Sequence, residues 1–228
     1  MIFINLAASI DPLESALFDI LEDKIATKLA IQPIIKLSDM SVFGYEVLSR
    51  WDEFAPDQIF RTAERFGTVG QLERLILSKV LDVLDVVPYP LFINVHPSIP
   101  NPKDWRELPK DKVVLEITED AAIRFPAVQS LRDFGFALAL DDLGKGSANL
   151  EALALIQPDY IKLDKSLIQS PNLMARNSLI KSLIDHAGRV KANLIVEGIE
   201  SAEHLLSVKT LGVSLAQGYY LAKPELLY

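Results

Sequence analysis

Eight polar residues of this chain could perform chemistry together, because each lies at or near the end of a short apolar run. They are Glu46, Asn94, Glu116, Asp141, Asp142, Lys162, Glu197 and Gln217. Acids at the carboxyl ends of successive strands converge on one spot when those strands close into a parallel barrel. Carboxylates buried together without a cation repel one another and are costly to desolvate. The pattern therefore predicts a divalent-metal site at the mouth of a barrel.

The available ligand types favour a hard cation. The chain has no cysteine and three histidines, His96, His186 and His204, the last two within predicted helices. Zinc prefers nitrogen and sulfur ligands, which makes it a poor candidate. Carboxylates and an amide oxygen suit Mg²⁺ or Mn²⁺. We expect one or two ions, since two metals can activate water and neutralise phosphoryl charge.

The pair Asp141-Asp142 is the strongest single element of this pattern. Adjacent residues on a regular strand face opposite ways, so both can face one site only where the strand ends and the backbone turns. The following Gly144-Lys145-Gly146 predicts that turn. Each residue also has an ordinary explanation: Asp-Asp before glycine is most often a cap or turn, and a single lysine such as Lys162 is usually at the surface. The metal hypothesis depends on the joint pattern.

The elements that must position these residues alternate between strand and helix. Residues 31–50 contain two β-type runs separated by the polar Leu37-Ser38-Asp39-Met40, which predicts a hairpin with an antiparallel first strand. Alternation of strands with helices then indicates a largely parallel sheet. The predicted strands are 91–96, 113–118, 136–141, 159–164, 193–198 and 215–221, and the predicted helices are 57–66, 69–86, 125–134, 148–155, 173–190 and 201–211.

The chain divides into residues 1–28, which precede the barrel, and a barrel domain over 29–228. Asp11 as N-cap, Pro12 at the first helical position and Glu14 at the capping-box position predict a helix in the first part. We expect this helix to plug the bottom of the barrel, with contact to a partner as the alternative. Its apolar side consists of Leu13, Leu17, Ile20, Leu21 and Ile25.

Composition narrows the function classes. The 228 residues carry a net charge of -8, which argues against a binder of duplex nucleic acid. Without cysteine there are no disulfides and no thiolate nucleophile. No apolar stretch is long enough to span a membrane, and the opening residues lack the basic region of a signal peptide. We expect a soluble cytoplasmic protein.

A series of short motifs follows in one order along almost the whole chain from about residue 28. The motifs are Gln32-Pro33, Glu46-Val47-Leu48-Ser49-Arg50, Asn94, Glu116-Ile117-Thr118-Glu119, Asp141-Asp142-Leu143-Gly144-Lys145-Gly146, Lys162-Leu163-Asp164, Glu197-Gly198-Ile199-Glu200 and Gln217-Gly218-Tyr219. This series resembles the signature of EAL-domain proteins. The resemblance implies an α/β fold, a modified (β/α)8 TIM-like barrel with an antiparallel first strand. It also implies a phosphodiesterase that uses Mg²⁺ or Mn²⁺ to linearise cyclic di-GMP to pGpG.

The resemblance also implies roles for individual residues. Lys162 would hold the attacking water, Glu197 would be a metal-linked ligand or general base, and Glu46 would be both a metal ligand and essential for catalysis. Glu119 would support the loop after Asp142. The remaining metal ligands would be Asn94, Glu116, Asp141 and Asp142, and the substrate-binding residues would be Gln32, Leu48, Arg50, Asp164 and Gln217.

Three positions depart from the family pattern. Val47 replaces the alanine of the Glu-Ala-Leu triplet and should alter packing only. His96 stands where serine is commoner, and we expect a hydrogen-bonded structural role for it. The loop 142–149 lacks the usual aromatic residues and gains Lys145, in a segment that the family links to the second metal and to dimer coupling. A catalytically inactive cyclic di-GMP receptor is therefore the alternative, a homodimer is possible, and another Mg²⁺-dependent barrel enzyme is a remote third hypothesis.

Overall fold

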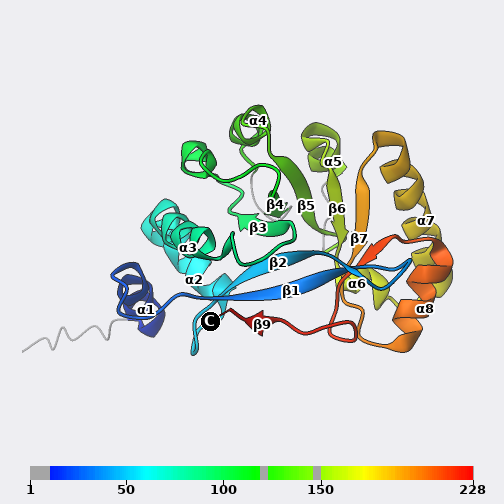
Figure 1. The fold of residues 1–228 in the computed structure, drawn as a ribbon, viewed down its shortest axis with the longest axis horizontal. Helices are drawn as coiled ribbons and strands as arrows, with labels where there is room; N and C mark the ends of the chain where they lie inside the picture. Colours follow the sequence, from blue (N-terminus) through cyan, green and yellow to red (C-terminus); the bar gives the residue numbers. More distant parts are fainter. Residues whose placement is uncertain (1–10, 119–122, 146–149, 228) are drawn as a thin grey trace, which may run out of the picture.

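The computed structural model describes residues 11–118, 123–145 and 150–227, and its strands close into a barrel with helices on the outside (Figure 1). Strand β1 pairs antiparallel with both β2 and β8, and the neighbouring pairs from β2 to β8 are all parallel. The predicted α/β barrel with an antiparallel first strand is confirmed. The barrel strands are β1 (Lys28–Lys36), β2 (Val42–Arg50), β3 (Leu91–Val95), β4 (Val113–Thr118), β5 (Ala137–Leu143), β6 (Tyr160–Leu163), β7 (Asn193–Val196) and β8 (Leu215–Ala216).

The helices cover the outside of the barrel, and three short elements lie beyond the predicted set. The short helix η1 (Pro102–Trp105) precedes β4, α6 (Lys165–Ile168) follows β6, and β9 (Glu225–Leu226) pairs with β1. The remaining helices are α1 (Pro12–Leu21), α2 (Pro56–Phe66), α3 (Val69–Val83), α4 (Phe125–Asp133), α5 (Leu150–Ile156), α7 (Leu173–Val190) and α8 (Ala202–Leu211).

Helix α1 begins as the sequence predicts, but it lies on the outside of the barrel. The Asp11 carboxylate accepts a hydrogen bond from the Leu13 N–H at 3.0 Å, and this satisfies one free donor of the first turn. Figure 1 shows α1 beside α2 and α3, and Phe18 contacts Phe66 of α2 edge to face. The expected plug of the barrel bottom is therefore wrong, because the apolar side of α1 is buried against helices.

The lower barrel interior is filled by the barrel's own side chains. A buried apolar layer is contributed by six strands, and the rings of Phe43 and Tyr160 pack against it. Its members are Ile34, Phe92, Val114, Ala139, Ile195 and Leu215. Side chains two residues apart share one face of a strand, so the next inward positions lie one level higher. On β3 to β8 those positions are the predicted site residues Asn94, Glu116, Asp141, Lys162, Glu197 and Gln217.

The last barrel strand is much shorter than the predicted 215–221. It ends at Ala216, and the Leu221 and Ala222 N–H groups donate to the Gly218 carbonyl in a turn. Gly218 approaches the neighbouring backbone so closely that an added Cβ would lie 2.2 Å from the Ile199 nitrogen. Packing between the ends of β7 and β8 therefore ends the strand, a contact that local propensity does not encode.

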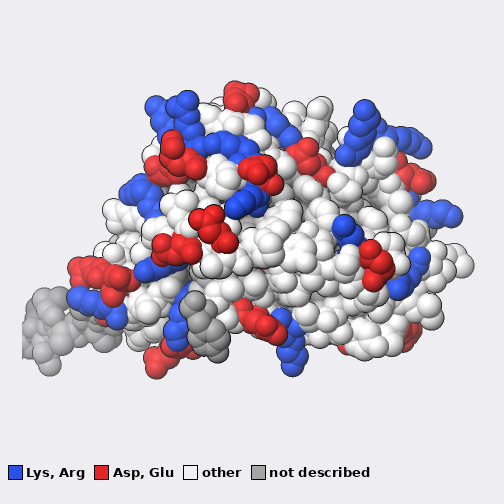
Figure 2. Space-filling view, viewed as in Figure 1, with Lys and Arg blue, Asp and Glu red and all other residues white. Residues whose placement is uncertain are grey.

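Acidic and basic side chains are interspersed on the face shown in Figure 2. The chain as a whole carries a net charge of -8. Across residues 11–118, 123–145 and 150–227, no helix combines the length and apolar character needed to cross a bilayer.

Candidate metal centre and adjoining cleft

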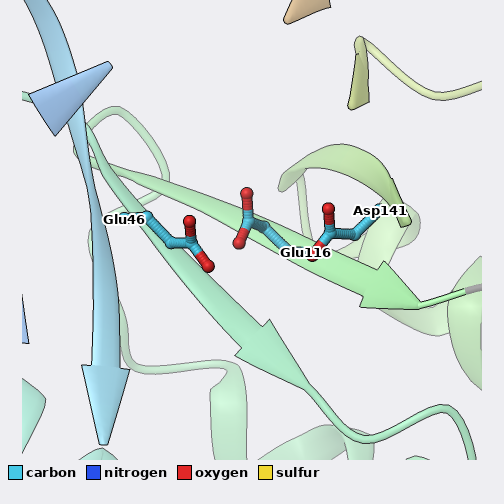
Figure 3. A group of neighbouring side chains, drawn as sticks. All are labelled: Glu46, Glu116 and Asp141. Carbon is cyan, nitrogen blue, oxygen red and sulfur yellow. The ribbon is translucent and has the colours of Figure 1, made fainter. Parts of the chain in front are cut away.

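Three carboxylates from three barrel strands point toward one another at the upper end of the barrel (Figure 3). Glu46 comes from β2, Glu116 from β4 and Asp141 from β5, and all three are buried. One oxygen from each lies within 4.8 Å of the other two, a separation at which a single cation can contact all three. We call these residues the first triad.

Lys162 of β6 places a positive charge among these acids. Its side chain is fully buried, so the surface location that is usual for a lysine is excluded. Its Nζ lies 2.9 Å from Glu116, 3.2 Å from Asp141 and 3.4 Å from Glu46. It also lies 2.8 Å from Oε1 of Glu197, which follows β7. One ammonium group is therefore shared by four carboxylates.

The shared ammonium does not balance the charge of the cluster. Burial raises the pKa of Glu116 and of Asp141, and Lys162 opposes both shifts only in part. Burial likewise raises the pKa of Glu197 to about 8. Burial alone would lower the pKa of Lys162, but the surrounding carboxylates together raise it well above its ordinary value. Burial is the largest cause of these three upward pKa shifts, so without a further cation the acids tend to hold protons.

The donor set fits a hard divalent cation. Glu116 Oε2 and Gln217 Oε1 are buried, and neither accepts a hydrogen bond from any described residue, while Glu116 Oε1 pairs with the Lys162 ammonium at 2.9 Å. Buried polar atoms are normally satisfied, so buried oxygens without a donor are suited to metal coordination. The residues that could hold an ion here are Glu46, Glu116, Asp141 and, at the edge of the cluster, Asn94.

A second acidic triad shares Asp141 with the first. Ligand oxygens of Asp141, Asp142 and Glu197 lie within 4.8 Å of one another. Both adjacent acids reach one site because Asp142 has a left-handed backbone, with φ of 61°, where the β5–β6 pairing is irregular. The reversal was expected at the glycines after the pair. It occurs two residues before Gly144, inside the strand, where the Asp142 N–H donates to the Asp141 carboxylate at 2.9 Å.

Three amide side chains surround Glu46. The Gln217 amide nitrogen donates to Glu46 Oε2 at 2.8 Å and to Gln32 Oε1 at 3.1 Å. The Asn94 amide nitrogen donates to Glu46 Oε1 at 3.3 Å. Gln32 lies directly opposite Glu46 in the β1–β2 pairing and also donates to the Ala222 carbonyl. These contacts fix the orientation of the Glu46 carboxylate.

A cleft of about 480 Å³ opens beside the two triads. Asn94, which donates to Glu46, and Asp142 both line the cleft, so it borders both triads. Leu48 and Arg50 of β2 form part of its wall. The Arg50 guanidinium donates to the Ser49 carbonyl at 2.9 Å. A separate hollow of about 450 Å³ around Lys36 and Lys209 lies at the other end of the barrel, away from the acids.

Asp164, another predicted site residue, lies apart from this group. Asp164 follows β6, and its carboxylate caps helix α6 by accepting from the Ser166 N–H at 2.8 Å. It is buried and does not line the cleft. Glu119, predicted to support the loop, lies outside the described residues.

The cleft also contains residues of α2 that the sequence analysis did not select. Asp57, Phe60, Arg61 and Glu64 line its outer wall. Their spacing of three and four residues places them on one face of a helix. This spacing is the sequence feature that could have identified them. The same spacing is typical of an ordinary solvated helix face, and nothing in the sequence shows that α2 borders the mouth of the barrel.

His96 is hydrogen-bonded, as expected, and lies in the cleft wall. Its Nε2 is 2.9 Å from Glu64 Oε1 and its Nδ1 is 2.7 Å from Ser98 Oγ. The ring stacks on Phe60, with an interplanar angle of 11°. The His96 N–H donates to the buried carboxylate of Glu73 on α3 at 2.9 Å. This network joins α2 and α3 to the end of β3.

A family model described as the EAL domain matches residues 19–224 of the chain. The cyclic di-GMP phosphodiesterase RocR from Pseudomonas aeruginosa is 32% identical over 219 residues. The match covers 85% of this chain and 56% of RocR. The probable cyclic di-GMP phosphodiesterase PdeD from Escherichia coli is 28% identical over 86% of this chain and 41% of PdeD. The chain thus spans about half the length of the curated relatives it matches.

Solved structures have the same barrel. The EAL enzyme Bd1971, in a form bound to cAMP and cyclic di-GMP, superposes with a TM-score of 0.79 at 26% identity, over 93% of this chain and 65% of that one. The predicted resemblance, which began from the order of the motifs, is confirmed by these matches.

Proposed function

The chain belongs to the EAL domain family, and on this premise we propose that it is a divalent-cation-dependent phosphodiesterase that hydrolyses cyclic di-GMP to linear pGpG. The observation that carries the proposal is the convergence of Glu46, Glu116 and Asp141 around one space, with Lys162 and Glu197 beside it. Relatives named as cyclic di-GMP phosphodiesterases support the substrate and the reaction.

The first triad and Asn94 would hold Mg²⁺ or Mn²⁺, and Asp142 and Glu197 would complete a second position with Asp141. A bound divalent cation lowers the pKa of water and neutralises phosphoryl charge. This addition of positive charge is required here, because a substrate with two phosphodiester groups cannot otherwise approach so many carboxylates. Gln217 and Gln32 orient Glu46 from the side opposite Asn94.

Lys162 and Glu197 are suited to handle the attacking water. The Lys162 ammonium and the Glu197 carboxylate are 2.8 Å apart, so a water held by Lys162 lies within hydrogen-bonding reach of Glu197. Glu197 takes the proton as the water oxygen attacks phosphorus. The bond from phosphorus to the ribose 3′-oxygen breaks, and that oxygen leaves in line with the attack and takes up a proton from solvent to give pGpG.

The cleft beside the triads would bind the rest of the cyclic dinucleotide. Arg50 presents a guanidinium that can pair with a phosphate oxygen in two parallel hydrogen bonds. Leu48 adds an apolar surface to the same wall. We keep Asp164 as a substrate-binding candidate from the sequence, although its carboxylate is engaged in capping α6. Glu119 as a loop support, a homodimer and a cytoplasmic location also stay predictions.

Incubating the purified chain with cyclic di-GMP and Mn²⁺ or Mg²⁺, and following pGpG by chromatography, tests the proposal. We expect pGpG with either ion and none with excess EDTA. Tight binding of cyclic di-GMP without turnover would favour the receptor hypothesis, for which the ion pair between Lys145 and Asp142 is the structural support. Neither binding nor turnover would contradict both.

A further inference from the structure

Lys145 places a second ammonium group against the acids. Its Nζ lies 2.9 Å from Asp142 Oδ2, and its backbone N–H donates to the Asp142 carbonyl at 3.0 Å. The intervening Gly144 has φ of 105°, a left-handed backbone that turns the chain back on itself. The tight turn, together with the side chain, therefore directs this ammonium toward Asp142.

The two triads consequently differ in how their charge is compensated. Lys162 contacts all three members of the first triad, and it also contacts Asp141 and Glu197 of the second. The second triad has Lys145 as a further cation. Lys145 contacts the second triad from the cleft side, where its own side chain is 53% exposed and that of Asp142 only 20% exposed. An ion entering the first triad meets the one ammonium of Lys162, whereas an ion entering the second triad meets that ammonium and the ammonium of Lys145 on Asp142.

The total charge of the two triads, Lys162 and Lys145 determines how strongly each divalent ion is attracted. Five carboxylates and two ammonium groups, when all are ionised, leave three negative charges. One divalent cation reduces this excess to one negative charge. A second would leave the group positive and close to Lys145, so its binding is opposed by like-charge repulsion. The first ion therefore gains more binding energy than the second.

We propose that Lys145 serves as an internal counter-cation for the second triad, so that the protein binds one divalent ion tightly in the first triad and a second only weakly. The inference rests on the proposed metal centre and deepens it. It assigns Lys145 as a positioning residue that sets metal stoichiometry, which is a property separate from turnover.

Titration with Mn²⁺, with free ion followed by electron paramagnetic resonance, tests this assignment without substrate. We expect one tight and one weak equivalent in the unaltered protein. Lys145→Gln should raise the weaker affinity about tenfold, since it removes one charge near a partly solvated site, and leave the tighter affinity unchanged. Lys181→Gln, an exposed lysine on α7, is the matched control for net charge and should change neither.

Lys145→Arg keeps the charge and should retain the unaltered pattern. Two equally tight ions in the unaltered protein, or a weaker affinity that Lys145→Gln leaves unchanged, would overturn the assignment. It would also be overturned if Lys145→Arg behaved like Lys145→Gln. Absence of any Mn²⁺ binding would instead refute the proposed metal centre itself. Thermal unfolding of each variant establishes that all are folded.

Discussion

The Nζ of Lys162 lies 2.8 Å from Oε1 of Glu197, although the two residues belong to different strand ends. Strands β6 and β7 pair in parallel with Lys162 opposite Ile195, two residues before Glu197. Residues two apart share a strand face, so both side chains point into the barrel and meet above the apolar layer. The ion pair is thus a direct product of parallel register, and it joins a buried cation to four acids.

Removing the Lys162 charge should destabilise the metal-free protein. Lys162→Met keeps most of the volume but leaves four carboxylates without their internal cation, at a cost of about 3 to 5 kcal/mol. We expect a lower melting temperature in EDTA and a larger rise on adding Mn²⁺ than in the unaltered protein. Lys181→Met is the matched surface control. Equal stability of Lys162→Met and the unaltered protein in EDTA would contradict the charge argument.

Glu46→Ala should abolish turnover, because it removes one member of the first triad and the acceptor for both Gln217 and Asn94. We also expect at least about a tenfold loss of Mn²⁺ affinity, the lower end of the effect of disturbing a metal-ligand network. Calorimetry and the pGpG assay measure the two effects. Glu203→Ala on α8 serves as the control. Near-normal turnover in Glu46→Ala would show that Glu46 is not a ligand.

Arg50→Ala should weaken substrate binding without affecting the metal. Loss of a charge-assisted contact to phosphate costs about 1.5 to 3 kcal/mol, which is about a tenfold or greater rise in KM. Arg50→Lys should recover only part of this loss, since an ammonium cannot reproduce the two-pronged geometry. Arg189→Ala, on the exposed face of α7, provides the comparison. A KM unchanged in Arg50→Ala would remove Arg50 from the substrate site.

Glu73 should make the stability of the fold pH-dependent. Burial raises its pKa from 4.5 to about 7, while the His96 N–H opposes the shift. The folded state therefore binds more protons than the unfolded state in this range, and stability must fall as the pH rises between those values. The full effect is about 3 kcal/mol and is complete above pH ~7.

Glu73→Gln keeps an acceptor for His96 and removes the charge, so its stability should fall less over the same pH range. Denaturant unfolding at several pH values measures the difference between the two proteins. Glu107→Gln, at an exposed position, should behave as the unaltered protein does. The assignment fails if Glu73→Gln and the unaltered protein lose stability in parallel from acid to neutral pH.

The sequence was sufficient for the strand order and most of the acidic cluster because both depend on local patterns. Period-two alternation places Phe92 below Asn94 and Val114 below Glu116, so each apolar run identifies the level at which its polar residue emerges. The antiparallel first strand followed from one polar turn between two β-type runs. These features require no knowledge of which elements are neighbours in space.

Only the tertiary structure determined which ammonium groups lie against which carboxylates. That Lys162 is fully buried, that Lys145 returns to Asp142, and that α2 forms a wall of the cleft all depend on contacts between elements far apart in the chain or on a left-handed backbone. Propensity cannot encode such contacts, because the energy of a buried charge is set by its surroundings. The sequence therefore predicted the proposed ligands, and the closure of the barrel determined how their charges are compensated.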